Sequence, residues 1–160
     1  MKILTINNKV DEKNLRTKTA DFDFSKFSKK EISELIKMMR LAMLEEKGIG
    51  LAANQIGLNV RVFVTRVNGK FYSFFNPEII KSSDETSIED EGCLSVPKTY
   101  GKVERNEKVV LSAYDKNSKP IKIKAKGVLA RVFQHEVDHL NGILFIDKAK
   151  DVRVIANNAI

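Results

Sequence analysis

The only two histidines of the chain, His135 and His139, lie four residues apart in the stretch QHEVDHLNG, residues 134–142. In a helix, side chains at positions i and i+4 share one face and lie about 6 Å apart. Two imidazoles at this spacing can bind the same metal ion. Glu136 would then lie beside the ion, where its carboxylate can accept a proton from a water molecule that the ion activates. Such a motif arises by chance about once in a thousand sequences, so we expect a metal site.

A catalytic tetrahedral metal site needs a third protein ligand and an open fourth position. A third histidine is excluded by the composition, and Glu136 is the last glutamate of the chain. The remaining downstream candidates are Asp147 and Asp151. The upstream candidate is Cys93, since a thiolate is a strong ligand for zinc or ferrous iron.

Cys93 lies in the stretch EDEGCLSVP, residues 89–97. A lone cysteine is usually a small buried hydrophobic residue. Here, however, Gly92 permits unusual backbone angles next to the sulfur, and Pro97 limits ladder pairing beyond it. Because the histidine pair lacks a third ligand, we interpret this stretch as a shaped loop, rather than a plain strand, that presents Cys93 to the metal.

A third stretch, GIGLAANQIG at residues 48–57, could approach a ligand closely. Gly48 and Gly50 leave room for a ligand against the backbone, and Gln55 offers an amide donor. The stretch contains neither GxGxxG nor GK[ST], which argues against a phosphate-binding loop.

Two helices are predicted to position these residues. Ser28 and Glu31 form a capping box at the start of a helix over residues 28–47, in which apolar residues recur at helical spacing. Gly48 is expected to end this helix. A second helix, over about residues 127–140, would carry both histidines.

Short strands are predicted between the helices. Residues 60–75 contain two strands joined by a hairpin turn at Asn68-Gly69. Residues 108–114 and 121–125 form another pair. This order predicts an α+β fold, with antiparallel sheets packed around a central C-terminal metal-binding helix and one long N-terminal helix, rather than a βαβ nucleotide-binding fold.

The composition predicts one domain over residues 1–160. The N-terminal segment has no apolar stretch typical of a signal peptide, and no run reaches the roughly 20 apolar residues of a membrane helix. A single cysteine suits a reducing compartment, so we expect a cytoplasmic protein without membrane attachment. The net charge of +7 is consistent with an acidic partner such as a ribosome, but the scattered lysines favour a solvated surface.

Together the three stretches resemble the peptide deformylase family. GIGLAANQ at 48–55 matches its glycine-rich segment ending in Gln, EGCLS at 91–95 matches its cysteine loop, and QHEVDHL at 134–140 resembles its helical motif, in which His-Glu is followed by Asp-His. The order and spacing agree, and the resemblance covers nearly the whole chain.

The resemblance implies hydrolysis of the formyl group from the N-terminal formyl-methionine of nascent polypeptides, with release of formate. It implies that Cys93, His135 and His139 hold one divalent metal ion. Ferrous iron is implied in the cell, and zinc, nickel or cobalt in preparations. Glu136 is implied as the general base and then the acid.

The resemblance also implies the substrate contacts. Gln55 and the backbone N–H of Leu94 would face the oxyanion. The backbone around Ile49 and Gly50 would pair with the substrate peptide in strand fashion. Gly92 and Arg131 would complete the substrate-binding surface.

Some residues depart from this pattern. Where the resemblance implies an apolar residue, the chain carries Arg131, one helical turn before His135. Its stem could lie on the pocket wall with its head in water, or its charge could change the preferred substrate side chain.

Asp138 is expected either to pair with Arg105 or to be an exposed carboxylate.

The C-terminal segment AKDVRVIANNAI is too short for a stable isolated helix. Ribosome association, if present, would therefore use a basic surface rather than a C-terminal helix, and we expect a monomer.

Two other functions are compatible with the sequence. One is a small zinc peptidase of the His-Glu-x-x-His type that uses Asp147 or Asp151, and the other is an inactive homologue that binds peptide or ribosome.

Overall fold

The computed structural model describes residues 2–155 of the chain. Its α-helices are α1 (Lys9–Leu15), α2 (Lys29–Glu45) and α3 (Val128–Leu140), and its short 3-10 helices are η1 (Phe24–Lys26), η2 (Ala53–Ile56) and η3 (Phe145–Asp147). Its strands are β1 (Gly50–Ala52), β2 (Val62–Val67), β3 (Lys70–Ser82), β4 (Thr86–Cys93), β5 (Val96–Asn106), β6 (Lys108–Tyr114), β7 (Pro120–Lys126) and β8 (Lys150–Val154).

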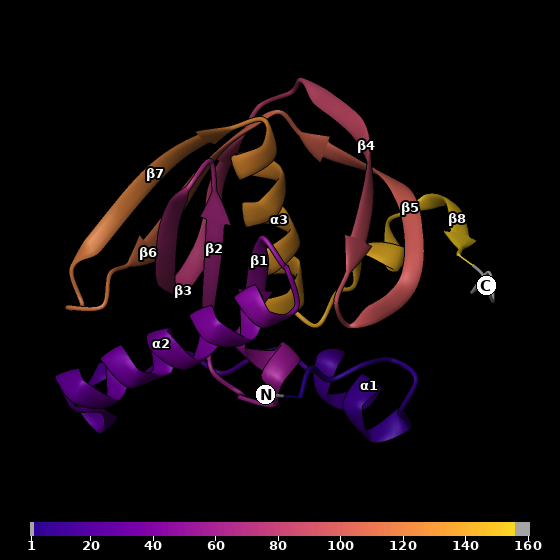
Figure 1. Ribbon diagram of the computed structural model, residues 1–160. Coiled ribbons are helices and arrows are strands. Elements are labelled where there is room, and N and C mark those ends of the chain that lie inside the picture. Colours follow the sequence, from indigo (N-terminus) through magenta and orange to yellow (C-terminus); the bar gives the residue numbers. More distant parts are fainter. Residues whose placement is uncertain (1, 156–160) are drawn as a thin grey trace.

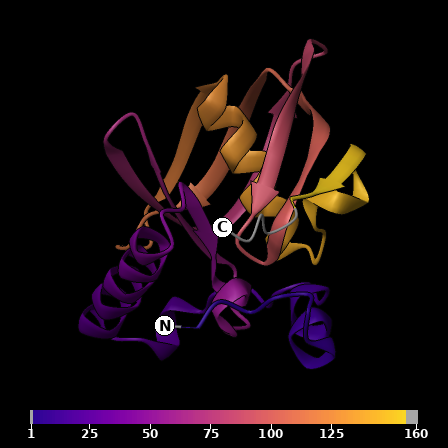
Figure 2. The same ribbon diagram turned by 45° about the vertical axis from the view of Figure 1, so that its right-hand side comes forward.

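Two antiparallel sheets lie on either side of α3 (Figure 1, Figure 2). The larger sheet has the strand order β1-β2-β3-β6-β7, and the smaller has the order β4-β5-β8. The predicted α+β fold, with antiparallel sheets around a central C-terminal helix, is confirmed.

Strand β2 separates α2 from α3 because successive side chains of a strand point to opposite faces of its sheet. Val62 and Val64 pack in one apolar cluster with Met43 of α2. Phe63, which lies between them, packs with Phe133 of α3. Helix α2 therefore covers one face of the five-stranded sheet, and α3 covers the other.

The long N-terminal helix begins where the sequence predicts. The Ser28 side chain accepts from the N–H of Glu31, and the Glu31 carboxylate accepts from the N–H of Ser28, which completes the capping box. The helix ends at Glu45, two residues before the predicted end at residue 47. Lys47 takes the left-handed conformation, with φ of 55°, and the Gly48 N–H donates to the Met43 carbonyl at 2.9 Å.

The two predicted strand pairs are confirmed. Asn68 and Gly69, with φ of 51° and 77°, form the turn between β2 and β3, and β6 pairs with β7. Strand β3 extends to Ser82, beyond the predicted end at residue 75. Register shifts after Phe75 break the two-residue alternation there, which is why the pattern did not predict the rest of the strand.

The interpretation of residues 89–97 as a loop is wrong. Cys93 is the last residue of β4, and Val96 opens β5, so that only two residues form the turn of a hairpin. The alternation of this strand was hidden because its inward face carries polar residues, including Ser87 and Glu91, where a strand that packs on a core usually carries apolar ones.

The described chain ends in strand β8, which pairs with β5, so residues 150–154 form no helix. Neither this strand nor the short helix α1 was predicted from the sequence. Residues 156–160 of the C-terminal segment lie outside the described residues. Within residues 2–155, no helix has the length and apolar character needed to cross a lipid bilayer.

Candidate active site

Helix α3 and the β4–β5 hairpin bring Cys93, His135 and His139 together. Their ligand atoms all lie within 4.8 Å of one another. The Nε2 atom of His139 lies 3.1 Å from the Cys93 sulfur and 3.2 Å from the Nε2 atom of His135. Because the two histidines are one helical turn apart, their rings face the same side of α3.

This donor set fits one divalent metal ion. Two nitrogens bound at 2.0–2.1 Å to a tetrahedral ion lie about 3.3 Å apart, close to the 3.2 Å between the two Nε2 atoms. Burial opposes ionisation of Cys93, but the neighbouring imidazoles outweigh it and hold the pKa of the thiol well below its usual value. One thiolate and two imidazoles suit zinc or ferrous iron.

The downstream aspartates do not join this group. Asp147 accepts hydrogen bonds from Arg16 and from the N–H of Leu144, and Asp151 lies on the exposed strand β8. The zinc-peptidase alternative therefore lacks its third ligand among the described residues.

Glu91 orients His135 and was missed in the sequence analysis. Its buried carboxylate accepts from the Nδ1 of His135 at 2.9 Å and from Arg105 at 2.9 and 3.0 Å. Burial alone would raise the pKa of Glu91, but the hydrogen bonds from His135 and Arg105 hold it well below the usual range. Glu91 and Cys93 are two residues apart, so they share the strand face toward α3. This signal was present in the sequence but was hidden by the loop interpretation.

The second imidazole has a different environment. The Nδ1 atom of His139 is buried without a hydrogen-bond partner among the described residues. The backbone carbonyl of His139 accepts from the Asn54 side chain at 2.6 Å.

The expected pair between Asp138 and Arg105 is present at 2.5 Å, and Lys148 also contacts Asp138.

Glu136 points toward Gly50 of β1. A Cβ atom on Gly50 would lie 2.2 Å from a carboxylate oxygen of Glu136, so only glycine leaves room for this side chain. The other oxygen, Oε2, is buried and has no partner among the described residues. Burial raises the pKa of Glu136 to about 7 despite the nearby imidazoles, which is a suitable range for a general base.

Gln55 lies beside the sulfur with a fixed orientation. Its Oε1 accepts from the Ala52 N–H at 2.9 Å, so its Nε2 must be the donor that faces Ser95 Oγ at 3.1 Å and Cys93 Sγ at 3.6 Å. Leu94 follows Cys93 in the hairpin turn. No described residue accepts a hydrogen bond from its backbone N–H.

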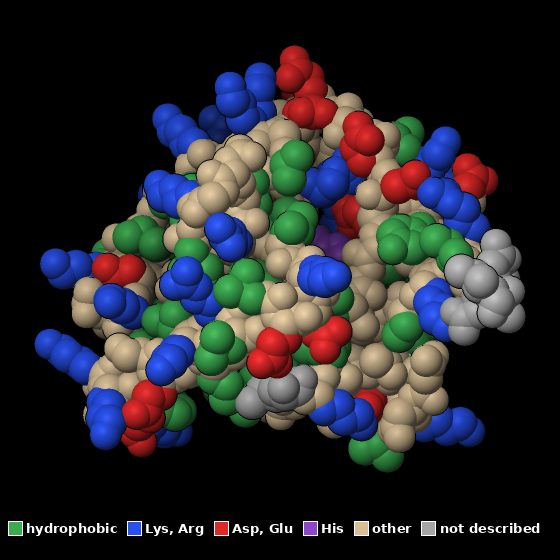
Figure 3. All heavy atoms as spheres, in the orientation of Figure 1, with side chains coloured by type: hydrophobic (Ala, Val, Ile, Leu, Met, Phe, Trp, Pro, Cys, Tyr) green, Lys and Arg blue, Asp and Glu red, His purple; other side chains and the backbone are tan. Residues whose placement is uncertain are grey.

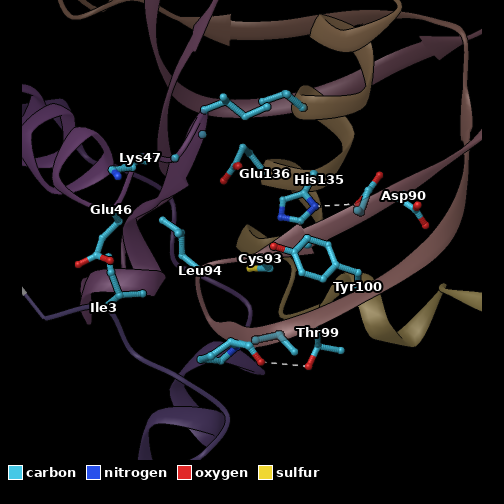
Figure 4. A pocket seen from close by; sticks show the side chains of 18 of the residues that line it. Ile3, Glu46, Lys47, Asp90, Cys93, Leu94, Thr99, Tyr100, His135 and Glu136 are labelled. Carbon is cyan, nitrogen blue, oxygen red and sulfur yellow. Dashed lines mark hydrogen bonds and ion pairs between the residues drawn. The ribbon is translucent and has the colours of Figure 1, made fainter. Parts of the chain in front are cut away.

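A cavity of about 840 Å³ opens beside these groups. Figure 3 shows a histidine side chain at the bottom of a hollow on this face of the molecule. In Figure 4, His135 projects from α3 toward Cys93, Glu136 projects from the same helix toward the purple strand β1, and Leu94 and Tyr100 stand on the surrounding wall.

Strand β1 forms one rim of the cavity and is an edge of its sheet. The Ile49 carbonyl accepts from the N–H of Arg66 and from the hydroxyl of Thr65, both on β2. Because backbone groups of consecutive residues alternate in direction, the N–H and C=O of Gly50 point to the free edge. The side chain of Ile49 is exposed at the same rim.

The last two predicted residues line the cavity for reasons that differ from the expectation. Gly92 does not have a left-handed φ; instead, a Cβ atom there would lie 2.8 Å from the Tyr100 ring. Of the two alternatives for Arg131, the one in which its charged head reaches water is wrong. Its side chain is 14% exposed, because Glu91, Ser87 and Val103 supply acceptors inside the protein.

A family model described as polypeptide deformylase matches residues 1–154. The chain belongs to the peptide deformylase family. A peptide deformylase of Halothermothrix orenii is 43% identical over 150 residues, which cover 92% of this chain and 94% of that protein. One of Treponema pallidum is 46% identical over 122 residues, which cover 76% of this chain and 73% of the relative.

Solved structures of peptide deformylases share this fold. The structure of a probable peptide deformylase from Synechococcus phage S-SSM7 is 42% identical, with a TM-score of 0.82, and the match covers 92% of this chain and 99% of that one. A Synechococcus elongatus peptide deformylase, solved with actinonin, is 34% identical, with a TM-score of 0.85, over 94% of this chain and 79% of that one.

Family membership establishes the reaction. This peptide deformylase is a metal-dependent hydrolase that removes the N-terminal formyl group from formyl-methionyl nascent polypeptides. Neither the zinc peptidase nor the inactive homologue is favoured by these matches.

Proposed function

We propose that Cys93, His135 and His139 hold the metal ion of this deformylase and that Glu136 transfers the proton during hydrolysis. The convergence of one sulfur and two Nε2 atoms within 4.8 Å carries this proposal. Glu136 supports it as a buried carboxylate on the same helix, with one oxygen unpartnered by any described residue.

The substrate peptide would add a strand to the free edge of β1. Gly50 supplies the N–H and C=O for this pairing, which reads the main chain and leaves the sequence of the peptide largely free. Ile49 contributes an exposed apolar side chain at the rim, and Gly92 and the stem of Arg131 contribute to the cavity wall. A peptide deformylase of Acinetobacter baumannii has been solved with Met-Ala-Ser bound, and a peptide of this kind is the product expected here.

In the reaction, the oxygen of a water molecule adds to the formyl carbon, the C–N bond breaks, and formate and a free α-amine leave. A divalent ion held by Cys93, His135 and His139 would lower the pKa of water and polarise the formyl carbonyl. Glu136 accepts the proton that the attacking water loses and delivers it to the departing nitrogen. Gln55 Nε2 and the N–H of Leu94 donate to the oxyanion of the tetrahedral intermediate, and one such donor lowers the barrier by about 3 kcal/mol.

Formate release from a formyl-methionyl peptide, measured together with bound metal, tests these roles. We expect Glu136→Gln to retain one metal ion per chain while kcat/KM falls about a thousand-fold. Glu89→Gln is the matched control, because Glu89 is an exposed residue of β4 and its loss should leave both quantities unchanged. A Glu136→Gln enzyme that turns over at the wild-type rate would remove Glu136 from the mechanism.

For the metal itself we propose ferrous iron in the cell, with zinc, nickel or cobalt able to occupy the same ligands. The thiolate and imidazole donors support this choice. Because an iron–thiolate site is open to oxidation, metal content and formate release should be compared after purification with and without oxygen. Activity that is lost in air together with iron supports ferrous iron, whereas equal activity and a zinc content of one per chain would contradict it.

We also propose that the chain is one catalytic domain that acts as a monomer in the cytoplasm, where formyl-methionyl chains are made. Any ribosome association would use a basic surface. Strand β7 supports this, since Lys122, Lys124 and Lys126 are exposed at alternate positions of an edge strand. Cosedimentation with ribosomes that falls steeply with ionic strength would support such contacts.

A further inference from the structure

Arg131 joins α3 to both strands of the β4–β5 hairpin. Its Nη1 donates to the Glu91 carboxylate and to the Val103 carbonyl, each at 2.9 Å. Its Nη2 donates to the backbone carbonyl and the hydroxyl of Ser87, at 2.9 and 3.1 Å. Ser87 and Glu91 belong to β4 and Val103 to β5, so a single guanidinium reaches three positions on the hairpin.

The carboxylate of Glu91 connects Arg131 to the metal site. Its Oε1 accepts from Arg131 and Arg105, and its Oε2 accepts from Arg105 and from His135 Nδ1, all at 2.9–3.0 Å. The dashed line from His135 in Figure 4 marks the last of these contacts. Because four donors hold one buried carboxylate, its plane is fixed, and the ring of His135 is oriented by that plane.

The three candidate ligands come from two separate elements. Cys93 is at the end of β4, whereas His135 and His139 are on α3. Their mutual distances therefore depend on how the hairpin sits against the helix. Arg131 reaches from helix to hairpin, and Arg105 reaches from hairpin to helix through Asp138. Both arginines meet at Glu91.

We propose that Arg131 is a positioning residue of the metal centre. It holds Glu91, and through Glu91 the His135 ring, in the orientation that binds the ion, and it sets the hairpin that carries Cys93 against α3. This inference rests on the proposed metal-binding role of Cys93, His135 and His139. It assigns the charge of Arg131 to metal retention rather than to a preference among substrate side chains.

The shape of the side chain explains why arginine suits this position. A planar guanidinium presents five donors in a fixed fork and can bridge several acceptors at once. The ammonium group of a lysine is a point charge and cannot reproduce contacts to Glu91, Val103 and Ser87 together. A methionine keeps much of the volume of the stem and removes every donor.

The rate at which folded, metal-loaded protein releases its ion to a chelator tests this inference, measured without oxygen on zinc-loaded enzyme. We expect Arg131→Met to release zinc about ten-fold faster than wild type, with Arg131→Lys between the two. Arg153→Met is the control, because Arg153 pairs with Asp90 on the exposed surface of the same sheet, and its release rate should equal that of wild type.

A purely structural role makes a different prediction. If Arg131→Met lowers the melting temperature of the metal-free protein but the folded protein releases zinc at the wild-type rate, the proposal is overturned. A double-mutant cycle shows whether Arg131 acts through Glu91. Once Glu91→Gln is present, adding Arg131→Met should accelerate zinc release by clearly less than ten-fold, because only the hairpin contacts to Ser87 and Val103 remain to be lost, whereas a full ten-fold further effect would show that Arg131 does not act through Glu91.

The same measurements distinguish this inference from the proposed function. Wild-type protein that binds no stoichiometric zinc would overturn both. Wild type that holds one zinc ion and releases it at the same rate as Arg131→Met and Arg131→Lys would overturn only the role of Arg131. Identical relative rates of wild type and Arg131→Met on formyl-methionyl and formyl-norleucyl peptides are expected, since the guanidinium faces the hairpin.

Discussion

The two sides of α3 are built from different chemistry. Toward the five-stranded sheet, Phe133, Val137 and Leu140 pack in an apolar cluster with residues such as Phe63 and Phe74. Toward the three-stranded sheet the same helix presents a polar row, which consists of Arg131, His135, Asp138 and His139. These side chains meet Glu91, Cys93 and Arg105 through hydrogen bonds and ion pairs.

This difference separates what holds the helix from what orients the site. Burial of apolar surface is favourable but has no preferred direction, so it holds α3 on the large sheet without fixing the angle of a side-chain ring. Hydrogen bonds are directional, but buried charges repay little of their desolvation cost. We therefore expect the apolar side to dominate stability and the polar side to dominate metal retention, and substitutions on the two sides should separate these properties.

Phe133→Ala should give the largest loss of stability. Phe133 is fully buried and touches the rings of Phe63, Phe74 and Tyr72, so its truncation should lower the free energy of unfolding by about 3–5 kcal/mol. Urea denaturation of the metal-free protein measures this change. Zinc release from the folded variant should stay within about two-fold of wild type, and Val128→Ala, at an exposed position of α3, serves as the control.

Glu91→Gln should weaken metal binding more than it weakens the fold. Gln keeps the shape of the side chain but removes the charge shared by two arginines and His135. The free energy of unfolding should fall by about 2–3 kcal/mol, while zinc affinity falls about 10–100-fold. Chelator competition measures the affinity, and an affinity equal to that of wild type would refute the division between the two sides of α3.

Asp138→Asn should refine the comparison within the polar side. Asp138 binds Arg105 and Lys148 but no candidate ligand. We expect a loss of about 1.5 kcal/mol in the free energy of unfolding and a change in zinc affinity of less than about three-fold. If Asp138→Asn lowers zinc affinity more than Glu91→Gln does, the effect depends on position along the helix rather than on a contact with His135.

Arg153→Gln should have the smallest effect. Arg153 and Asp90 form an ion pair between half-exposed side chains of β8 and β4, and such surface pairs contribute little to stability. Thermal melting should be unchanged, with or without zinc. A clear drop in the melting temperature would show that the edge of the small sheet contributes more to stability than its exposure indicates.

The elements that carry regular patterns were predictable from the sequence. The capping box at Ser28 and the hairpin at Asn68-Gly69 depend on local chemistry that the structure reproduces. The helix that carries the histidines was predicted over about residues 127–140 and spans Val128–Leu140, with Asn141 as its C-cap and Gly142, at φ of 75°, after it.

The polar side of α3 was not predictable to the same degree. Cys93 and the two histidines were identified by the chemistry of a metal site, but Glu91 was overlooked because the alternation of β4 places polar residues on its inward face. The alternative that placed the Arg131 head in water failed for the same reason. Its hydrogen-bond acceptors belong to β4 and β5, a strand pair that the pattern did not predict. Long-range pairing of this kind leaves no local signal in one sequence.

The most direct test of the central claim is X-ray absorption at the zinc edge, on wild-type protein loaded with one zinc ion without oxygen. The first coordination shell should contain one sulfur at about 2.3 Å and two nitrogens at about 2.0–2.1 Å. These would be the Cys93 thiolate and the imidazoles of His135 and His139. A shell that contains only nitrogen and oxygen, without any sulfur, would contradict the account.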